Sequence, residues 1–347
     1  MIKDRIIGNE RSPDYFVIFN YGLTAKHFIN ENITLHPYHV KNPVGLITLY
    51  DVMIVEVNFT EDETPTEFNP ESDDPWKVVV NSESAYYSRD QLEIFLACFQ
   101  ISNQPSDEKL NLFNFLASSS NAIFNPIANP FPVGIMSNSY PIRLGNSTFV
   151  SENLSSQHNL IIDSVVNSSY YQFGAPYFVG LITPTQISNS IEFYKKVQSI
   201  TNKRNTKNER ETSRLLQNIL LNYYKSKIDD TLISISNSMG IIESMFGAPE
   251  NITMSIQERV PKYLGDDSEK LSKILKKMYD IRSINAHLKY SHQFSSHPNL
   301  HNFYDNKRLI SSLTTILIEK WVNEIFNGKT RKEFRNLFID DEKYHKK

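Results

Sequence analysis

The sequence predicts an α+β protein of two domains, in which a mixed, strand-rich domain over residues 1–183 precedes an all-helical domain over residues 184–330. Length is the first reason, because 347 residues at one domain per about 150 residues give about two domains. The second reason is the uneven distribution of charge along the chain. Residues 1–183 hold 9 Lys+Arg against 20 Asp+Glu, whereas the rest of the chain holds 27 against 19, for a net charge of −3 overall. A charged tail over residues 331–347 is expected to fray.

Clusters of β-branched and aromatic residues predict strands in the first domain, over residues 15–19, 45–57 and 76–80, with further candidates between residues 149 and 182. Between the second and third clusters, an acidic stretch that contains prolines is typical of a loop.

A helix is expected to begin at Ser88, which has the side chain of a good N-cap. The apolar positions that follow at helical spacing are Leu92, Phe95, Leu96 and Phe99. Cys98 lies among them and is expected to be an inert core thiol.

Helical periodicity dominates the chain from Pro184 onward. It predicts a bundle of about five or six helices, over residues 185–200, 209–226, 229–246, 252–264, 268–288 and 307–326. Residues 201–208 are basic and polar and are expected to form a turn. Gly247 and Pro249 are expected to end the third helix.

Several classes of protein are excluded by what the sequence lacks. No apolar stretch of 18 residues predicts a membrane span, and the first ten residues carry no apolar signal-peptide core. A single cysteine excludes disulfides and multi-cysteine metal sites and suits a reducing cytoplasm. No phosphate-binding glycine motif or nucleophile elbow is present, so neither nucleotide-driven nor serine-hydrolase chemistry is expected.

The helix over residues 268–288 ends in a motif of Arg, four residues and His, in the run Lys-Ile-Leu-Lys-Lys-Met-Tyr-Asp-Ile-Arg-Ser-Ile-Asn-Ala-His that places Arg282 and His287. Upstream, the helix over residues 229–246 carries Glu243 near its end. A short helix separates the two, and an apolar helix closes the bundle. In these features residues 185–330 resemble the HEPN superfamily, within it the Apea-like HEPN domains. Ser283 departs from the family, where Asn, Asp or His often follows the Arg.

The resemblance implies a metal-independent endoribonuclease that acts as a homodimer in the cytoplasm and serves as a toxin or abortive-infection effector against phage. It implies Arg282 and His287 as catalytic residues. Four further positions are supporting residues in this interpretation: Asp280, Ser283, Asn285 and Glu243. No metal and no cofactor are expected.

Elementary chemistry agrees with such a pair. A neutral histidine can take the proton of a ribose 2′-OH, and arginine can bind the phosphate as a fork. Five positions along a helix separate the two side chains by about 140°, so one helix makes a poor site. Two helices related by a two-fold axis can face one groove. The buried stripe is expected to follow Ile274, Met278, Ile281, Asn285 and Leu288, with Arg282 beside it.

A structural role is the alternative for the same residues, with Arg282 paired to Asp280 or Glu243 and His287 only packing or capping. A binding role is the second alternative, in which a non-catalytic HEPN module binds RNA or a partner protein. A third is an interaction protein whose helical half only dimerises.

Basic residues near the motif are candidates for RNA binding, and they comprise Lys273, Lys276, Lys277 and His292, with Lys270 beside them. A solvated helix face is the alternative. Four histidines lie at positions 287, 292, 297 and 301. The favoured interpretation places them in a solvated or substrate-facing loop, and the alternative is a zinc site. Arg204, Lys207 and Arg210 could steer a polyanion or be merely solvated.

The first domain belongs to no family that the sequence identifies, and its ligand or trigger is unknown. We expect it to be a sensor or regulator. Its acidic surface could mimic RNA and occlude the basic half, in which case deleting residues 1–183 should raise ribonuclease activity. His36 and His39, which flank Pro37 and Tyr38, are expected to be structural.

Overall fold

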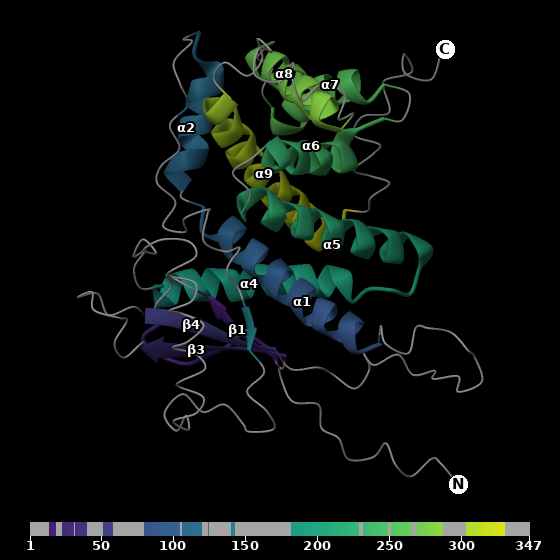
Figure 1. Ribbon diagram of the computed structural model, residues 1–347. Coiled ribbons are helices and arrows are strands. Elements are labelled where there is room, and N and C mark those ends of the chain that lie inside the picture. Colours follow the sequence, from purple (N-terminus) through teal and green to yellow (C-terminus); the bar gives the residue numbers. More distant parts are fainter. Residues whose placement is uncertain are drawn as a thin grey trace. The chain divides into compact units, whose positions relative to one another are not determined.

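The computed structural model describes residues 14–18, 23–30, 32–39, 51–57, 80–104, 106–119, 124, 140–142, 182–228, 232–248, 251–265, 269–286 and 303–329. Over these residues the protein combines helices with an antiparallel sheet, so its α and β content is confirmed (Figure 1). The predicted loop and the strand candidates after residue 149 lie outside them.

The chain divides into two compact units, and the division differs from the single boundary that we predicted. One unit comprises residues 1–92 and 135–184, and the other comprises residues 93–134 and 185–347. Residues 93–134, which we had placed in the first domain, therefore belong to the helical unit. The reason is the apolar face of the first helix, where Leu92, Phe95, Leu96 and Phe99 are all buried.

The sheet of the first unit has the strand order β2-β3-β4-β1-β5. Its strands are β1 (Asp14–Ile18), β2 (His27–Phe28), β3 (Ile33–His39), β4 (Asp51–Val57) and β5 (Tyr140–Ile142). The clusters predicted at residues 15–19 and 45–57 are confirmed as β1 and, in the described part, as β4.

Strand β3 was not predicted, because Pro37 interrupts its sequence pattern. The structure tolerates this proline because β2 pairs only with Thr34 and Leu35, so Pro37 faces a partner strand on one side alone. His36 is buried in β3, and its Nε2 lies 2.6 Å from Oε2 of Glu56 on β4. This buried contact fits the structural role predicted for His36, and the side chain of His39 lies outside the description.

The described helices are α1 (Val80–Ser102), α2 (Ser106–Ala117), α4 (Pro184–Thr201), α5 (Lys207–Ile228), α6 (Leu232–Phe246), α7 (Ile252–Leu264), α8 (Glu269–Ala286) and α9 (Phe303–Phe326). The last six match the six predicted ranges to within a few residues. No described helix is long and apolar enough to cross a membrane.

The start of α1 was predicted wrongly. The helix begins at Val80, so Ser88 lies inside it and is no N-cap, and Val80 is helical rather than part of a strand. No glycine or proline interrupts residues 80–88, and serine inside a helix costs only a fraction of a kcal/mol. Nothing local therefore stops the helix before residue 88. Cys98 is buried as expected, and burial raises the pKa of its thiol.

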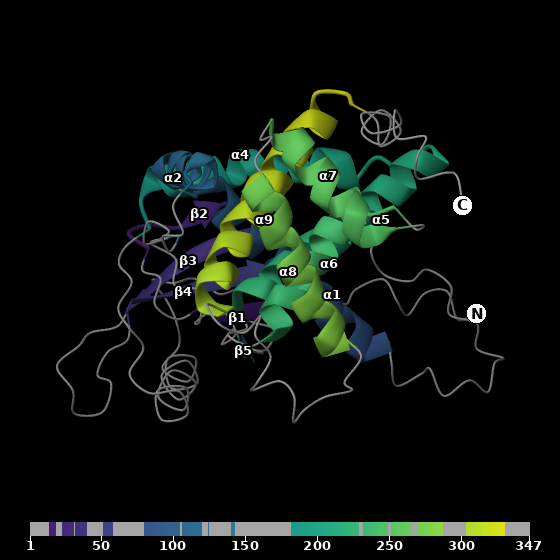
Figure 2. The ribbon, with the colours of Figure 1, turned by 90° about the horizontal axis from the view of Figure 1, so that it is seen from above.

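Helix α6 is the centre of the helical unit and contacts α5, α7, α8 and α9. Figures 1 and 2 show it between α5 and α8. A central helix needs apolar groups on several faces, and Ile235, Met239, Ile242 and Phe246 of α6 are all nearly or fully buried. Residues at the end of α6 are consequently held from several sides.

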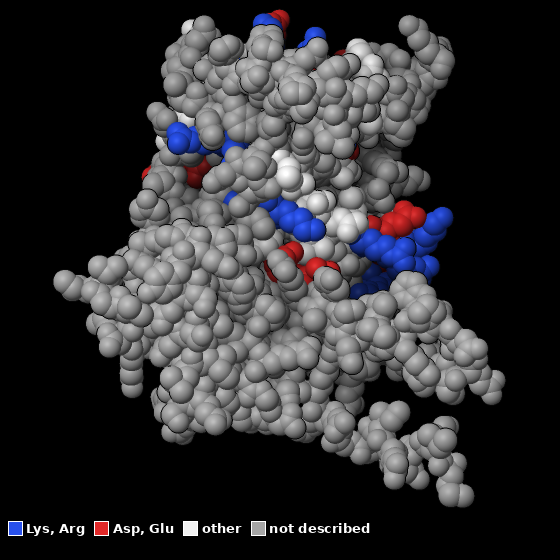
Figure 3. Space-filling model, viewed as in Figure 1, with Lys and Arg blue, Asp and Glu red and all other residues white. Residues whose placement is uncertain are grey.

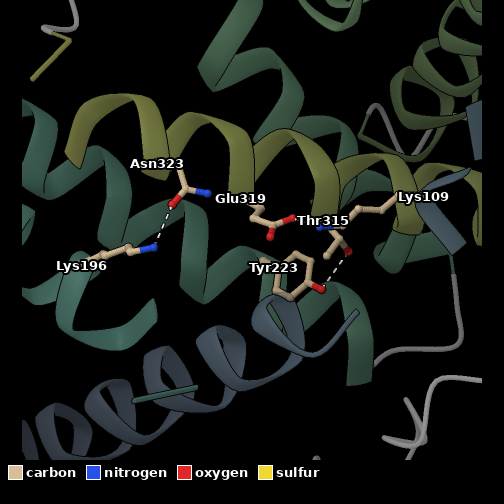
Figure 4. Close-up of polar contacts among 6 residues, drawn as sticks. All are labelled: Lys109, Lys196, Tyr223, Thr315, Glu319 and Asn323. Atoms are coloured by element: carbon tan, nitrogen blue, oxygen red, sulfur yellow. Dashed lines mark hydrogen bonds and ion pairs between the residues drawn. The ribbon is translucent and has the colours of Figure 1, made fainter. Parts of the chain in front are cut away.

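Helix α9 makes polar contacts to three other helices (Figure 4). The Tyr223 hydroxyl of α5 lies 2.9 Å from Oγ1 of Thr315. Nζ of Lys196 in α4 donates to Oδ1 of Asn323 at 3.3 Å. Buried hydrogen bonds of this kind fix one register between helices, because an unmatched polar group there costs about 1–3 kcal/mol.

Helix α2, which we did not predict, belongs to this bundle. Lys109 forms an ion pair with Glu319 of α9, and Ser312 of α9 donates a hydrogen bond to Glu108. A truncation that removes residues 1–183 therefore deletes α2 from the bundle together with the first unit. Its effect on activity cannot isolate a regulatory role of the first unit.

Gly240 inside α6 and Gly247 directly after it give a matched prediction. A Cβ at Gly240 meets nothing within 4 Å, whereas a Cβ at Gly247 meets the carbonyl oxygen of Glu243 at 2.7 Å. We expect Gly240→Ala to stabilise the protein by about 0.5–1 kcal/mol, because alanine loses less backbone entropy in a helix. Gly247→Ala should destabilise it, because the end of α6 must shift. Urea unfolding of the two variants checks this, and equal effects would contradict it.

Candidate functional site

The motif lies on α8, whose buried stripe differs from the one we predicted. Its fully buried residues are Leu271, Leu275, Met278 and Ile281. At 100° per residue Arg282 lies about 20° from Leu271 around the helix. Arg282 therefore projects from the buried stripe toward the bundle rather than flanking it. Ile274 is only half-buried, and the side chains of Asn285 and Leu288 lie outside the description.

Arg282 forms an ion pair with Glu243 in the last turn of α6. Nη2 of Arg282 lies 2.8 Å from Oε2 of Glu243, and the side chains are 31% and 13% exposed. Of the two partners that we considered for Arg282, the structure therefore selects Glu243. Asp280 is half-buried and takes part in no ion pair among the described residues. The contact between α6 and α8 brings together residues 39 positions apart in sequence.

Burial makes this ion pair costly to break. Desolvation raises the pKa of the Glu243 carboxyl, and the charge of Arg282 opposes that rise. Within the described structure, Oε1 of Glu243 is buried and has no hydrogen-bond partner. The carboxylate thus depends on Arg282, since removing one member of a partly buried pair leaves the other charge uncompensated. The two side chains act as one unit.

Arg282 retains groups that can bind an anion. Its guanidinium has five N–H donors in a rigid fork. One nitrogen is occupied by Glu243, and almost a third of the side chain remains exposed. The Tyr279 ring lies 5.9 Å from Cζ, at the outer limit of a cation–π contact. A guanidinium held in this way is a preorganised donor for a phosphate oxygen.

The second catalytic candidate, His287, lies directly after Ala286, where the described part of α8 ends. His287 and His292 are outside the described residues, as are the histidines at positions 297 and 301. Ser283 is half-buried beside Arg282. The predicted helix included His287, and the described residues do not test that extension.

The lysines predicted to bind RNA lie on another face of α8. Lys273 and Lys276 are exposed and lie about 180° and 120° around the helix from Arg282. Lys277 is half-buried and lies about 140° away. Lys273 also pairs with Glu269 at 2.8 Å, which lowers the pKa of that carboxyl. The structure does not bring these lysines and Arg282 together on one face.

Lys270 has a structural role instead. Its ammonium donates to the carbonyl oxygens of Phe115 at 2.7 Å and Ser118 at 3.3 Å, at the end of α2. A cation at a helix C-terminus satisfies carbonyls that lack intrahelical partners. Lys270 therefore fastens α2 to α8 and is not free to steer a substrate.

Metal ligands do not gather in the part of the chain that the structure describes, where no three His, Cys, Asp or Glu side chains lie close enough to hold an ion.

The sequence analysis left out Lys203 and Arg214, which flank the three cations that it named near residue 207. The signal was available as charge density over residues 202–214.

Comparison of the chain with protein-family models, with curated proteins and with solved structures finds no match. The candidate site is therefore argued from its own residues.

Proposed function

We propose that the protein is a metal-independent endoribonuclease of the HEPN type, with Arg282 and His287 as its catalytic residues. The observation that carries the proposal is the ion pair between Arg282 and Glu243, 2.8 Å long. It joins the motif helix to the helix in which the resemblance expects a glutamate. It also holds a partly exposed guanidinium in one orientation.

The proposed reaction uses the RNA 2′-OH as nucleophile. Neutral His287 takes its proton, the 2′-oxygen forms a bond to the adjacent phosphorus, and the bond from phosphorus to the 5′-oxygen breaks. The proton is delivered to the leaving 5′-oxygen, and the products are a 2′,3′-cyclic phosphate and a 5′-hydroxyl. Arg282 neutralises the charge that develops on the phosphate oxygens.

Glu243 is a positioning residue in this account. Arginine side chains have about 2 kcal/mol of rotamer entropy to lose when they are fixed. The buried carboxylate orients the guanidinium before substrate binds, so less of that cost falls on the reaction.

A homodimer through the helical unit completes the proposed site, because an Arg and a His from each protomer can then face one RNA strand. The cellular role that the resemblance implies is that of a cytoplasmic toxin or anti-phage effector. The first unit would then sense an unknown trigger.

Substrate chemistry tests the proposal. Full-length protein with EDTA should cleave labelled single-stranded RNA to products with cyclic phosphate ends and should leave DNA of the same sequence intact, because DNA lacks the nucleophile. Cleavage of both substrates, or cleavage of RNA that EDTA stops, would contradict the mechanism.

A non-catalytic RNA-binding module is the second candidate, and the same ion pair favours it. Glu243 already neutralises Arg282 within one protomer, which is what a purely structural arginine requires. This function predicts that RNA binding survives every substitution that would disable cleavage.

A further inference from the structure

The turn between α4 and α5 concentrates positive charge. Residues 202–214, here called the basic turn, contain five cations and two acids. The cations are Lys203, Arg204, Lys207, Arg210 and Arg214, and all are exposed. Figure 3 shows blue side chains gathered around a smaller red group at the end of the molecule where α4 and α5 meet in Figure 1.

The local structure presents these cations from a rigid frame. Thr206 and Glu209 form a capping box at the start of α5, with Thr206 N to Glu209 Oε2 at 2.8 Å and Glu209 N to Thr206 Oγ1 at 3.1 Å. Nη1 of Arg210 donates to the carbonyl of Arg204 at 3.2 Å, and Ser213 Oγ donates to the carbonyl of Thr201 at 2.8 Å. The turn is thus tied to both helices.

Among the described residues, no ion pair joins a carboxylate of the basic turn to one of its cations. Glu209 is engaged by the backbone of its capping box. None of the five cations forms an ion pair with a described residue, whereas exposed lysines elsewhere in the unit do, as in Lys273–Glu269 and Lys329–Glu324. Five cations that lie this close together in sequence repel one another, and that repulsion is relieved when a polyanion binds.

Spacing arranges three of the charges in a line. Lys207, Arg210 and Arg214 follow one another at i, i+3 and i+7 on α5, so they lie on one face over about 10 Å. Lys203 and Arg204 precede this row in the turn and are exposed as well. A row of cations along one helix face suits a chain of phosphates better than a single anion.

The remaining residues of the turn indicate which polyanion fits. Residues 202–214 include three Asn, two Thr and one Ser and no apolar or aromatic residue. Membrane-surface segments add apolar anchors to their basic residues, and surfaces on which bases stack add aromatic platforms. Amides and hydroxyls beside Arg and Lys are the groups that contact phosphate and sugar.

We propose that the basic turn is a docking surface for the sugar–phosphate backbone of RNA, independent of base sequence. The choice of RNA rests on the proposed ribonuclease function. The surface would hold the strand by charge, while Arg282 and His287 act on one phosphate of it.

A matched pair of triple variants tests the proposal in the full-length chain. The first, Lys203→Gln, Lys207→Gln and Arg214→Gln, removes three cations of the basic turn and spares Arg210, which bonds within the turn. The control, Lys195→Gln, Lys225→Gln and Lys262→Gln, removes three exposed lysines elsewhere in the same unit. Both variants are first compared with wild type by thermal unfolding.

The probe is a fluorescein-labelled single-stranded 2′-O-methyl RNA, which the proposed reaction cannot cut, titrated at several salt concentrations. The slope of log K against log salt should be shallower by about 2 for the first variant, and Kd at 0.1 M salt should rise about 100-fold, because three phosphate contacts are lost at about 0.7 counterions each. The control should bind as wild type does.

Equal weakening by both variants would overturn the proposal, since it would show only a general effect of charge. Wild-type affinity in the first variant would overturn it as well. So would a wild type that binds phosphatidylserine vesicles and not the RNA. If only the first variant loses RNA binding while the wild type cuts no RNA, the docking surface is supported and the proposed nuclease activity is rejected.

Discussion

Arg282→Lys is expected to lower the rate of RNA cleavage by about 100-fold and to change the free energy of unfolding by less than about 1 kcal/mol. Lysine keeps the positive charge beside Glu243, so the buried carboxylate stays neutralised. It loses the planar fork that can hold Glu243 and a phosphate at the same time. Removing one preorganised donor to the transition state costs about 10²–10³ in rate.

Arg308→Lys provides the matched control, because Arg308 is exposed on α9 and lies outside the candidate site. Cleavage by this variant should equal that of wild type. If Arg282→Lys also cleaves RNA at the wild-type rate and unfolds normally, Arg282 serves only to neutralise Glu243, and the binding module becomes the better account.

Lys227→Met is expected to stabilise the protein by about 1–2 kcal/mol at pH 7. Lys227 is buried between α5 and α9, where its ammonium donates to Ser311 and, at 3.3 Å, to Oγ1 of Thr315. Burial lowers its pKa to about 8, and the charge of Glu108 only partly opposes this shift. The folded protein therefore pays to keep this lysine charged at neutral pH.

The pH dependence has a definite sign. Unfolded lysine has a pKa of about 10.4, so between that value and the folded value of about 8 the unfolded chain holds a proton that the folded chain has released. Stability of the wild type should rise with pH over this window. Below this window Lys227 is protonated in both states, and burying its charge costs the folded wild type about 3 kcal/mol. Lys227→Met removes this cost but also loses hydrogen bonds of about 1 kcal/mol each, so its net stabilisation is smaller.

Urea unfolding from pH 7 to pH 10.5 measures both effects, with the exposed Lys225→Met as control. The rise in stability should disappear in Lys227→Met and persist in the control. Destabilisation of Lys227→Met by several kcal/mol at every pH would show that Lys227 is a well-compensated charge, contrary to this account.

Periodic apolar residues were sufficient to predict the six helices of the second half to within a few residues. The same reasoning missed α2, where Glu108 is buried while Leu110 is 60% exposed. A buried acid and an exposed leucine reverse the usual pattern, and the reason that Glu108 is inside lies in other helices, in its hydrogen bond from Ser312 of α9 and in the nearby charge of Lys227 of α5. The predicted start of α1 was wrong because Ser88 is a residue type that often caps helices but does not lie at a helix end here.

Placement of the site residues depended on packing that sequence spacing does not contain. Ile274, Leu275 and Met278 are equally apolar, and the position of α6 decides which of them defines the buried stripe of α8. Because of the position of α6, Arg282 lies on the face of α8 that packs in the bundle and pairs with Glu243. Glu243 and Asp280 were the two partners that the sequence analysis considered. The lysines of α8 fall on another face for the same reason.

The most direct test of the proposed catalysis compares wild type with His287→Ala on labelled single-stranded RNA in the presence of EDTA. The account predicts cleavage by wild type to cyclic phosphate products and a loss of at least about 100-fold in the variant, because general base catalysis contributes about 10²–10⁴ in rate. Equal cleavage by the two proteins would contradict it, since the activity would then not depend on His287.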